Sequence, residues 1–361
     1  MAIIDKPTDY FNTKIYTGNS SSQTLSMANI GLAWFKSRSD SGGQLLFDIM
    51  RGGNGTNSQE PILKTNSTVK DQGSDITAAG GLVFGSSSTS VGTDNGGYNY
   101  NQNGKSYVNW HWRAGTSFTN DASATGIGTI DSAGNFNNTS GFSVVLYTGT
   151  GSNGTVKHGL NSTPSMIMFK RTDSSGAWPT WHVSLGTNIM EINSYGASQS
   201  GSSYTNSTAP TSSVFSIGTS GDINANGGIY IAYCFSEKES YSKFSHYIGN
   251  GSASNGTFIY TGFKPAFVIL KNATQSGKWL MMDDKRPTAA PGNPNNARLF
   301  AGDSNAESTA NNMINLLSNG FKLTTSDSDH NASGDTNIYM AFAENPFVTS
   351  TDNGSIPATA R

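Results

Sequence analysis

The chain has 361 residues, a length that favours two or three domains over a single hydrophobic core. Charged residues make up 13% of it and the formal net charge is −2, so no basic surface for nucleic acid or anionic lipid is expected. Its 42 glycines would suit a disordered chain, but aromatic residues make up 11% and fall in clusters, which is typical of a folded, loop-rich protein.

The N-terminal segment and the single cysteine indicate where the chain folds. The opening "MAIIDKPTDYF" has no charged region followed by an apolar run, so we predict no signal peptide and expect folding in a cytoplasm. No apolar run approaches the ~20 residues that a membrane span requires. Cys234 is the only cysteine, which excludes an intrachain disulfide, and its apolar neighbours in "IYIAYCF" predict a buried, inert thiol.

Six landmarks recur three times in the same order and predict an internal repeat. Each copy opens on Tyr-x-Gly, reaches an apolar strand that ends in Lys, and passes through a Ser/Gly turn and further strands. It closes on an aromatic strand: "SYVNWHW", "IYIAYCF" or "IYMAFAE". The opening tyrosines and the landmark lysines are Tyr16 and Lys36, Tyr147 and Lys170, and Tyr247 and Lys271. We expect the glycine after each tyrosine to supply the positive φ of a turn.

The predicted segments are short, rich in Val, Ile, Phe, Tyr and Trp, and separated by Gly/Ser/Asn/Asp turns, so the fold class is all-β. We predict three tandem homologous β-sandwich domains, jelly-roll-like with long polar loops, at 9–115, 141–238 and 241–348. Residues 116–140 are interpreted as a polar linker and 349–361 as a C-terminal tail. The short join between the second and third copies predicts a tight pair, with the first copy more independent. Residues 306–320 are the exception, a predicted short helix.

The strands "LAWFK", "MIMFK" and "FVILK" are apolar on both faces. Such a strand lies between layers or against another domain or subunit. We therefore expect the three repeats to pack together. We also predict a homo-oligomer, with a homotrimer as the preferred state.

The sequence offers few groups for catalysis, and we predict no catalytic residue and no cofactor. Five histidines lack metal-ligand spacing, and no nucleotide-binding or nucleophile-elbow motif occurs. Asp48, His182 and Asp283 occupy the same position after the landmark lysines, and Asp284 follows Asp283. Neighbouring strand residues point to opposite faces, so the doublet is not an acid/base pair by itself. Asp48, Asp283 and Asp284 are interpreted as surface acids. An acid/base pair between domains or subunits remains the alternative.

One polar hairpin has a weak resemblance to a calcium loop. Asp327, Asp329 and Asn331 have the spacing of the first three EF-hand ligands. However, Ala332 and Ile338 stand where the EF-hand requires Gly and Glu, so a turn with Asx hydrogen bonds is the ordinary alternative and no metal is predicted.

Four residues of the second copy are candidate ligand-binding residues. Trp178 has a counterpart in Trp279 and is predicted to be core, whereas Trp181 has Met282 at the matching position. An exposed Trp181 could stack on a sugar ring. The other candidates lie in the polar hairpin "DINANG" before the last strand and are Asp222, Asn224 and Asn226.

Several phrases resemble a family of phage proteins. The stretches "APTSSVFSIGTSGD", "YSKF", "YTGFKPAFV" and "IYMAFAENPF" are similar to the uncharacterised repeat domain of tail-fibre and other virion proteins of marine bacteriophages, including those that infect cyanobacteria. The resemblance runs from about Asp9 to Phe347 and is weakest in the first copy, where "NIGLAWFK" departs from the pattern. It brings no catalytic residues with it.

The resemblance implies a virion structural protein, made in the host cytoplasm and located on the particle. A tail-associated fibre or host-recognition (adhesin) component is the first interpretation. A capsid decoration or head-fibre protein, a glycan depolymerase and a free carbohydrate-binding module are the alternatives. The expected partners are further copies of the chain, other phage tail or capsid proteins, and host surface glycan, without nucleic acid or membrane insertion.

Overall fold

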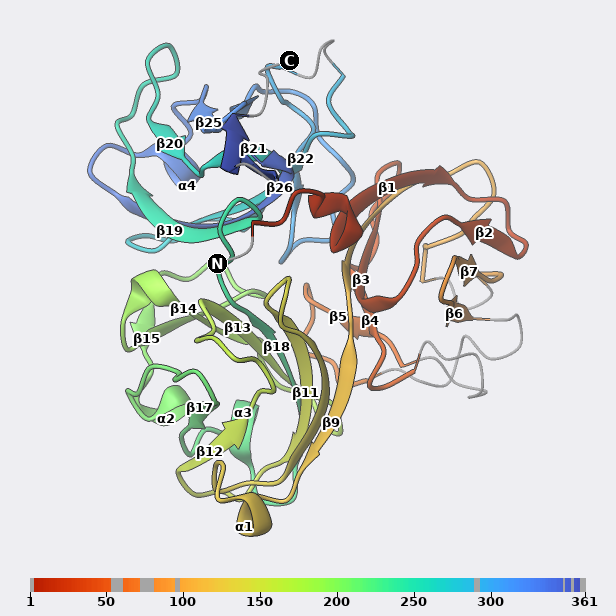
Figure 1. Cartoon of the computed structure of the whole chain (residues 1–361). Helices are drawn as coiled ribbons and strands as arrows, with labels where there is room; N and C mark the ends of the chain where they lie inside the picture. Colours follow the sequence, from red (N-terminus) through yellow and green to blue (C-terminus); the bar gives the residue numbers. More distant parts are fainter. Residues whose placement is uncertain are drawn as a thin grey trace.

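The computed structural model describes residues 3–52, 61–71, 81–94, 98–288, 293–346, 348–351 and 354–357. The chain is mostly β, and its sheets are antiparallel, which confirms the predicted fold class (Figure 1). Three sheet pairs are present, one for each repeat, and each pairs a larger sheet with a smaller one. They surround a common centre, with repeat 1 in red and orange, repeat 2 in yellow and green, and repeat 3 in teal and blue (Figure 1).

Repeat 1 has a larger sheet with the order β1-β8-β3-β4-β5 and a smaller sheet with the order β2-β7-β6. Its elements are η1 (Pro7–Asp9), β1 (Phe11–Thr17), β2 (Gln23–Leu25), β3 (Ile30–Ser37), β4 (Leu45–Asp48), β5 (Leu63–Lys64), β6 (Leu82–Phe84), β7 (Thr89–Val91) and β8 (Ser106–Arg113).

Repeat 2 has an eight-stranded sheet with the order β16-β15-β14-β13-β18-β11-β10-β9, and a smaller sheet of β12 and β17. Its elements from β11 onward are β11 (Phe142–Thr148), β12 (Gly154–Lys157), β13 (Met166–Arg171), β14 (Pro179–His182), η3 (Val183–Leu185), β15 (Asn188–Glu191), β16 (Gln199–Ser200), α2 (Ser202–Thr205), β17 (Val214–Ile217), α3 (Gly221–Asn224) and β18 (Ile229–Phe235).

Repeat 3 has a larger sheet with the order β19-β26-β21-β22-β23 and a smaller sheet with the order β20-β25-β24. Its elements are β19 (Ser242–Ile248), β20 (Phe258–Tyr260), β21 (Phe263–Asn272), β22 (Leu280–Asp283), β23 (Leu299–Phe300), β24 (Ile314–Leu317), β25 (Gly320–Leu323), α4 (Ser328–Asn331) and β26 (Thr336–Pro346).

The larger sheets share one strand order, in which the last strand of a repeat lies between its first strand and its long apolar strand. The register differs in one respect. Tyr147 lies opposite Tyr230 in repeat 2, whereas Tyr247 of repeat 3 lies opposite Asn337, two residues before Tyr339. A shift of two residues leaves every side chain on its original face, so the sandwich survives it.

The interpretation of residues 116–140 as a linker is wrong. This segment contains β9 (Thr116–Asn120), α1 (Ala122–Thr125) and β10 (Ser132–Asn137), and β10 pairs with β11. The pairing extends the larger sheet of repeat 2 along its outer side (Figure 1). Strand pairing depends on main-chain groups, so a Ser/Thr/Asn-rich segment can occupy an edge that lacks a partner.

Two further segments, the predicted helix and the predicted C-terminal tail, contain β-hairpins instead. The predicted helix at 306–320 contains β24, which pairs with β25 across a short turn, because Ile314 and Leu316 alternate inward with the period of a strand. In the predicted C-terminal tail, the described part forms a hairpin of β27 (Val348–Thr351) and β28 (Gly354–Pro357). Within the described residues, no helix is long and apolar enough to cross a membrane.

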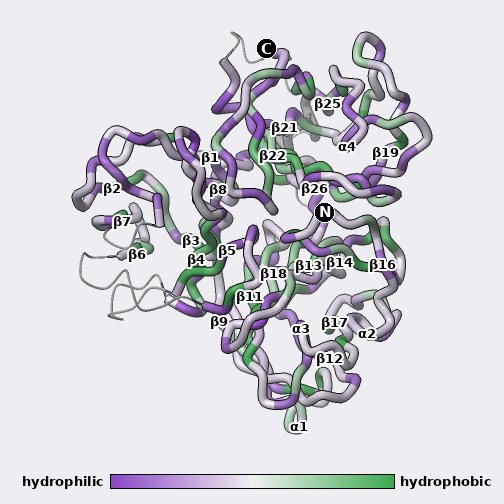
Figure 2. The backbone as a smooth tube through the Cα atoms, turned by 180° about the vertical axis from the view of Figure 1, so that it is seen from behind, coloured by the Kyte–Doolittle hydropathy of each residue, from purple (hydrophilic) through white to green (hydrophobic). Residues whose placement is uncertain are grey.

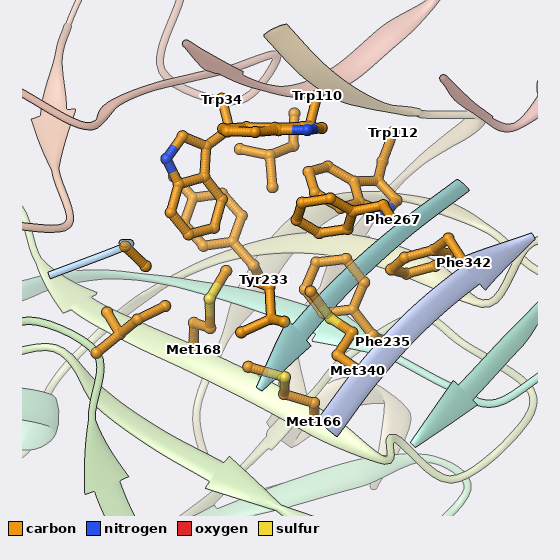
Figure 3. Packing of buried hydrophobic residues seen from close by; sticks show 14 of the residues in the cluster. Trp34, Trp110, Trp112, Met166, Met168, Tyr233, Phe235, Phe267, Met340 and Phe342 are labelled. Carbon is orange, nitrogen blue, oxygen red and sulfur yellow. The ribbon is translucent and has the colours of Figure 1, made fainter. Parts of the chain in front are cut away.

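The strands with two apolar faces divide their side chains between two cores. In β13, Met166 and Met168 point to a core shared by all three repeats, while Ile167 and Phe169 point to the sandwich core of repeat 2. The strands β3 and β21 divide their side chains in the same way. We call the shared cluster the central core. Figure 3 shows its labelled members: Trp34, Trp110, Trp112, Met166, Met168, Tyr233, Phe235, Phe267, Met340 and Phe342.

The central core confirms that the repeats pack together. Hydrophobic residues lie along β3, β4 and β22, near the place where the repeats meet (Figure 2). Because one chain buries both faces of these strands, the apolar faces no longer argue for a homotrimer. That prediction has lost its premise.

Candidate functional site

The landmark lysines are buried where one repeat meets the next. Each ammonium donates to a main-chain carbonyl of another repeat, and burial lowers the pKa of each lysine to about 8. The bonds are Lys36 Nζ to Ser304 O (3.1 Å), Lys170 Nζ to Thr68 O (2.9 Å) and Lys271 Nζ to Tyr195 O (3.2 Å). Repeat 1 therefore bonds to repeat 3, repeat 3 to repeat 2, and repeat 2 to repeat 1. The three repeats close a ring.

Main-chain hydrogen bonds follow the same cycle. The glycine six residues after each lysine donates to the carbonyl that also binds that lysine: Gly42 to Ser304 (2.7 Å), Gly176 to Thr68 (2.8 Å) and Gly277 to Tyr195 (2.8 Å). A second set runs the other way: Glu307 to Arg38 (3.0 Å), Asp71 to Thr172 (3.1 Å) and Ser198 to Ala273 (3.0 Å). All three contacts share this pattern, so the prediction of a tight pair and a more independent first copy is wrong.

The predicted structural role of Trp178 and Trp279 is confirmed, because both are buried and their indole N–H groups bond to the next repeat. Trp178 donates to Lys64 O (3.0 Å) and Trp279 to Glu191 O (3.0 Å). In repeat 1 the same position holds Gln44, whose amide donates to Phe300 O at 2.7 Å. Sequence reasoning missed this residue, because an amide replaces an indole as the donor.

Asp48 and Asp283 are buried, so their interpretation as surface acids is wrong. Each accepts main-chain N–H bonds from the turn that follows it and forms an ion pair with the arginine three residues later, Arg51 or Arg286. Each also accepts a bond from an aromatic side chain of a neighbouring repeat: Tyr233 OH to Asp48 (2.8 Å) and Trp110 Nε1 to Asp283 (2.9 Å). These carboxylates hold repeats together and are not available to a substrate.

The sequence carried a signal for these ion pairs that our interpretation missed. Arginine follows aspartate by three residues in both copies, at Asp48 and Arg51 and at Asp283 and Arg286. Asp284 lies apart from this network, against Lys285 at 2.7 Å, and burial raises the pKa of its carboxyl to about 7. The doublet thus divides between two environments, as neighbouring strand positions should.

In repeat 2 the matching position holds His182, which is neutral in this setting. Its Nε2 lies 3.1 Å from Tyr339 O of repeat 3, and its Nδ1 accepts the N–H of Ser184. Burial lowers the pKa of His182 to about 4, and likewise lowers those of His158 to about 4 and His111 to about 3. His111 and His182 are thus buried structural residues of their strands. Cys234 is also buried, which raises its thiol pKa to about 12.

The opening tyrosines explain why Tyr-x-Gly recurs. Each hydroxyl donates to the carbonyl that precedes a buried asparagine in the same repeat. The bonds are Tyr16 to Tyr100 O before Asn101, Tyr147 to Ile223 O before Asn224, and Tyr247 to His330 O before Asn331. These asparagines in turn donate hydrogen bonds to main-chain carbonyls of surrounding loops, so they hold the loops of each sandwich in place.

The glycine after each tyrosine is required for close approach, and the predicted positive φ is wrong. Gly18, Gly149 and Gly249 do not have positive φ values. A Cβ there would overlap the carbonyl oxygen of the residue after each buried asparagine. The positive φ belongs instead to the next glycine of the motif, at Gly151 (+74°) and Gly251 (+71°).

The candidate binding residues of repeat 2 are largely internal. Trp181 is only 2% exposed and donates to Gly186 O, so it cannot stack on a sugar in this structure. Asp222 accepts the N–H of Ala177 at 2.9 Å, and the amide of buried Asn224 donates to Ser152 and Gly218. Of the four candidates, Asn226 alone is exposed. Side chains alternate between the two faces along β14, and Trp181 lies on the inward face. The difference from Met282 at the matching position of repeat 3 therefore did not indicate exposure.

The weak calcium candidate folds as an Asx-capped turn. Asp327 caps α4 by accepting the N–H of Asp329 at 2.8 Å, and Asn331 is buried with its amide bonded to Thr325 O. Asp329 accepts the N–H of Lys278, as Asp222 does for Ala177 in repeat 2. Throughout the part of the chain that the structure describes, no cluster of His, Cys, Asp or Glu could hold a metal ion.

A surface groove of about 710 Å³ lies between repeat 1 and the strand β10. Its wall includes Tyr10, Phe84, Arg113 and Asn29, and among the described residues that line it Asp9 is the only acidic one. Aromatic rings, amides and one cation are suited to binding a polar ligand such as a saccharide. Glycoside hydrolysis commonly uses two carboxylates, and this groove offers one.

The fold and these contacts define a class of protein: an internally repeated all-β ring with approximate threefold symmetry. The chain belongs to the DUF7483 family, a domain of unknown function, whose model matches residues 6–346. The match runs through all three repeats, so the whole ring corresponds to one family domain. No curated protein matches the chain.

Proposed function

We propose that this chain is a structural component of a bacteriophage virion, associated with the tail and active in host recognition. Its phrases resemble phage virion proteins, and its architecture suits the role. The ring is held by buried main-chain and ion-pair contacts, which suits a part that must stay folded outside a cell. The observation that carries the proposal against an enzyme is the burial of Asp48 and Asp283 in those contacts.

Immunogold labelling of particles tests the location. Antibodies raised against the purified ring should label the tail, and the same serum absorbed with the ring should label nothing. Label spread over the head would favour a capsid decoration or head-fibre protein, which the same ring could also serve. Particles without label would contradict both.

Host glycan is the proposed ligand, and the groove beside Tyr10 and Arg113 is its proposed site. A glycan array with the whole protein should give binding that Arg113→Ala weakens, because the guanidinium donates to sugar hydroxyl or carboxylate groups. Lys105→Ala, at an exposed pair with Asp40, is the control. Release of sugar fragments from host polysaccharide would instead support a depolymerase.

A further inference from the structure

Arg113 stands at a position where repeat 1 differs from the other two repeats. In each repeat one main-chain N–H near the end of the closing strand donates to the carbonyl just before the first strand. These bonds run from Arg113 to Tyr10 O (2.9 Å), from Ser236 to Gly141 O (2.7 Å) and from Ala343 to Tyr241 O (2.8 Å). Ser236 and Ala343 are each only 1% exposed, whereas Arg113 is half-buried and lines the groove. Repeats 2 and 3 thus have a small buried residue where repeat 1 has a cation.

A shorter connection accompanies this arginine. In repeat 2 the segment before β13 lies against the matching position, where Ser236 Oγ donates to Ser162 O at 3.0 Å. The stretch from the opening tyrosine to the landmark lysine is shorter in repeat 1 (16–36) than in repeat 2 (147–170). The groove lies beside the shorter stretch, and Asn29 of that stretch forms part of its wall.

Hydrogen bonds fix the wall of the groove. Asn29 N donates to Gly85 O, and Ala114 N donates to Asn29 O, both at 3.0 Å. Gly115 N donates to Asn135 Oδ1 on β10 at 2.7 Å, which joins the two sides of the groove. Because its lining is held in place by the fold, the groove can bind a ligand with little loss of conformational entropy.

The groove presents a cation that no acid of the protein neutralises. Among the described residues, the guanidinium of Arg113 makes no hydrogen bond and no ion pair. Asp9, the acidic residue of the lining, pairs with Lys6 at 2.9 Å. The side chain of Asn137 accepts the N–H of Thr139 through Oδ1, which leaves its NH₂ group free to donate. The polar groups available to a ligand are therefore mainly donors.

We propose that this groove binds an acidic saccharide, with its anionic group on Arg113 and a sugar ring against Tyr10. The inference rests on the proposed function and narrows its ligand to one chemical class. A guanidinium is a planar fork of donors that matches two oxygens of a uronate carboxylate or of a sulfate ester. The Tyr10 ring is held by an edge contact with Tyr241, at 6.0 Å between centroids, and can stack on the sugar.

A nucleic acid is a poorer occupant, although its phosphates are also anionic. Binding a phosphate backbone commonly takes several lysines and arginines along one surface. The described lining of this groove has one cation, and the whole chain has a net charge of −2. One cation beside an aromatic ring and amide donors is suited to a single acid group on a sugar.

The test uses the whole protein and two matched pairs of trisaccharides in isothermal titration calorimetry. The first pair is trigalacturonic acid and its methyl ester, and the second is a sulfated galactotriose and galactotriose itself. We expect at least one acidic member to bind at least about tenfold more tightly than its neutral counterpart. The pair that shows the preference identifies the anionic group as carboxylate or sulfate.

Variants of Arg113 locate the site. Arg113→Gln should reduce the affinity for the acidic trisaccharide to that for the neutral one, and leave the neutral affinity unchanged. Arg113→Lys should retain part of the preference, because lysine keeps the charge without the fork. Lys105→Gln, which removes a cation from the exposed pair with Asp40, is the matched control and should bind like the parent. An unchanged melting temperature of Arg113→Gln would show that the fold is intact.

Three results would overturn the inference. Equal affinities within both pairs would make the ligand a neutral saccharide and leave the proposed glycan binding standing. A preference for acid that persists in Arg113→Gln would exclude this groove as its source. Absent binding of all four trisaccharides would exclude the acidic class. The glycan array then decides the proposed function separately, because binding to other glycans would retain it and a blank array would remove it as well.

Discussion

Two of the three contacts around the ring contain a buried Asp–Arg ion pair, and the third has a neutral histidine at the same position. We call the first two the charged contacts and the third the neutral contact. Repeats 1 and 3 each contribute a buried aspartate and arginine that meet an aromatic donor of the neighbouring repeat. Repeat 2 contributes His182 and Leu185 at the same positions, facing repeat 3. The lysine and main-chain bonds are alike in all three contacts. The main-chain pattern therefore defines the ring, and the buried ion pair is one of two chemistries that it accommodates.

The largest expected effect comes from breaking one ion pair. Arg51→Leu leaves Asp48 buried without its cation and should reduce the free energy of unfolding by about 3–5 kcal/mol. Urea denaturation measures the change. Lys105→Gln breaks the exposed pair with Asp40 and should change stability by less than ~1 kcal/mol. Similar losses in both variants would contradict a special role for the buried pair.

Acid should weaken the neutral contact. His182 has a pKa of about 4 in the folded protein and 6.5 as the reference value, so the unfolded chain binds a proton first as pH falls. Its contribution is complete above pH 6.5 and is lost towards pH 4, by about 3 kcal/mol. His182→Gln should remove that part of the difference in unfolding free energy between pH 7.5 and pH 4. His111 and His158 remain in both proteins, so an unchanged pH dependence would contradict the assignment.

A feature common to all repeats should respond alike in each. Gly149→Ala places a methyl group against the carbonyl of Ala225 and should destabilise the protein by about 1–3 kcal/mol, with Gly249→Ala giving a similar loss. Gly221→Ala is the control, since an added Cβ there meets no atom within 4 Å. Thermal unfolding measures all three variants. Equal melting temperatures for Gly149→Ala and Gly221→Ala would contradict the close approach.

The smallest effect is expected when a charged contact is converted to the neutral type. The triple variant Asp48→His/Arg51→Leu/Tyr233→Phe copies the side chains of His182, Leu185 and Phe342. Replacing a whole buried pair by neutral groups is often close to neutral, so we expect a change within about 1–2 kcal/mol. Urea denaturation of the triple variant and of Arg51→Leu compares the two losses in unfolding free energy. A loss as large as that of the single variant would show that the charged contact is not interchangeable.

Local pattern was sufficient for part of this fold. Repeat order, the landmark strands and the packing of repeats followed from aromatic strands and from apolar residues on both faces. The role of 116–140 did not, because polar residues give a strand no periodic signal and its partner edge exists only in the folded chain. The depth of Asp48 and Asp283 was missed for a related reason: their partners Tyr233 and Trp110 are distant in sequence.

Because the ring is built from one chain, each of its three repeats can change in sequence without the same change in the other two. A homotrimer must place every substitution three times and separates into subunits on dilution, whereas covalently joined repeats meet at a fixed effective concentration. Unfolding of this protein should therefore be independent of its concentration. Each repeat can also specialise alone: repeat 1 exposes Thr24 on β2, repeat 2 has the added strands β9 and β10, and repeat 3 exposes Phe258 and Tyr260 on β20. A symmetric trimer would present one kind of edge three times, and this ring presents three kinds once.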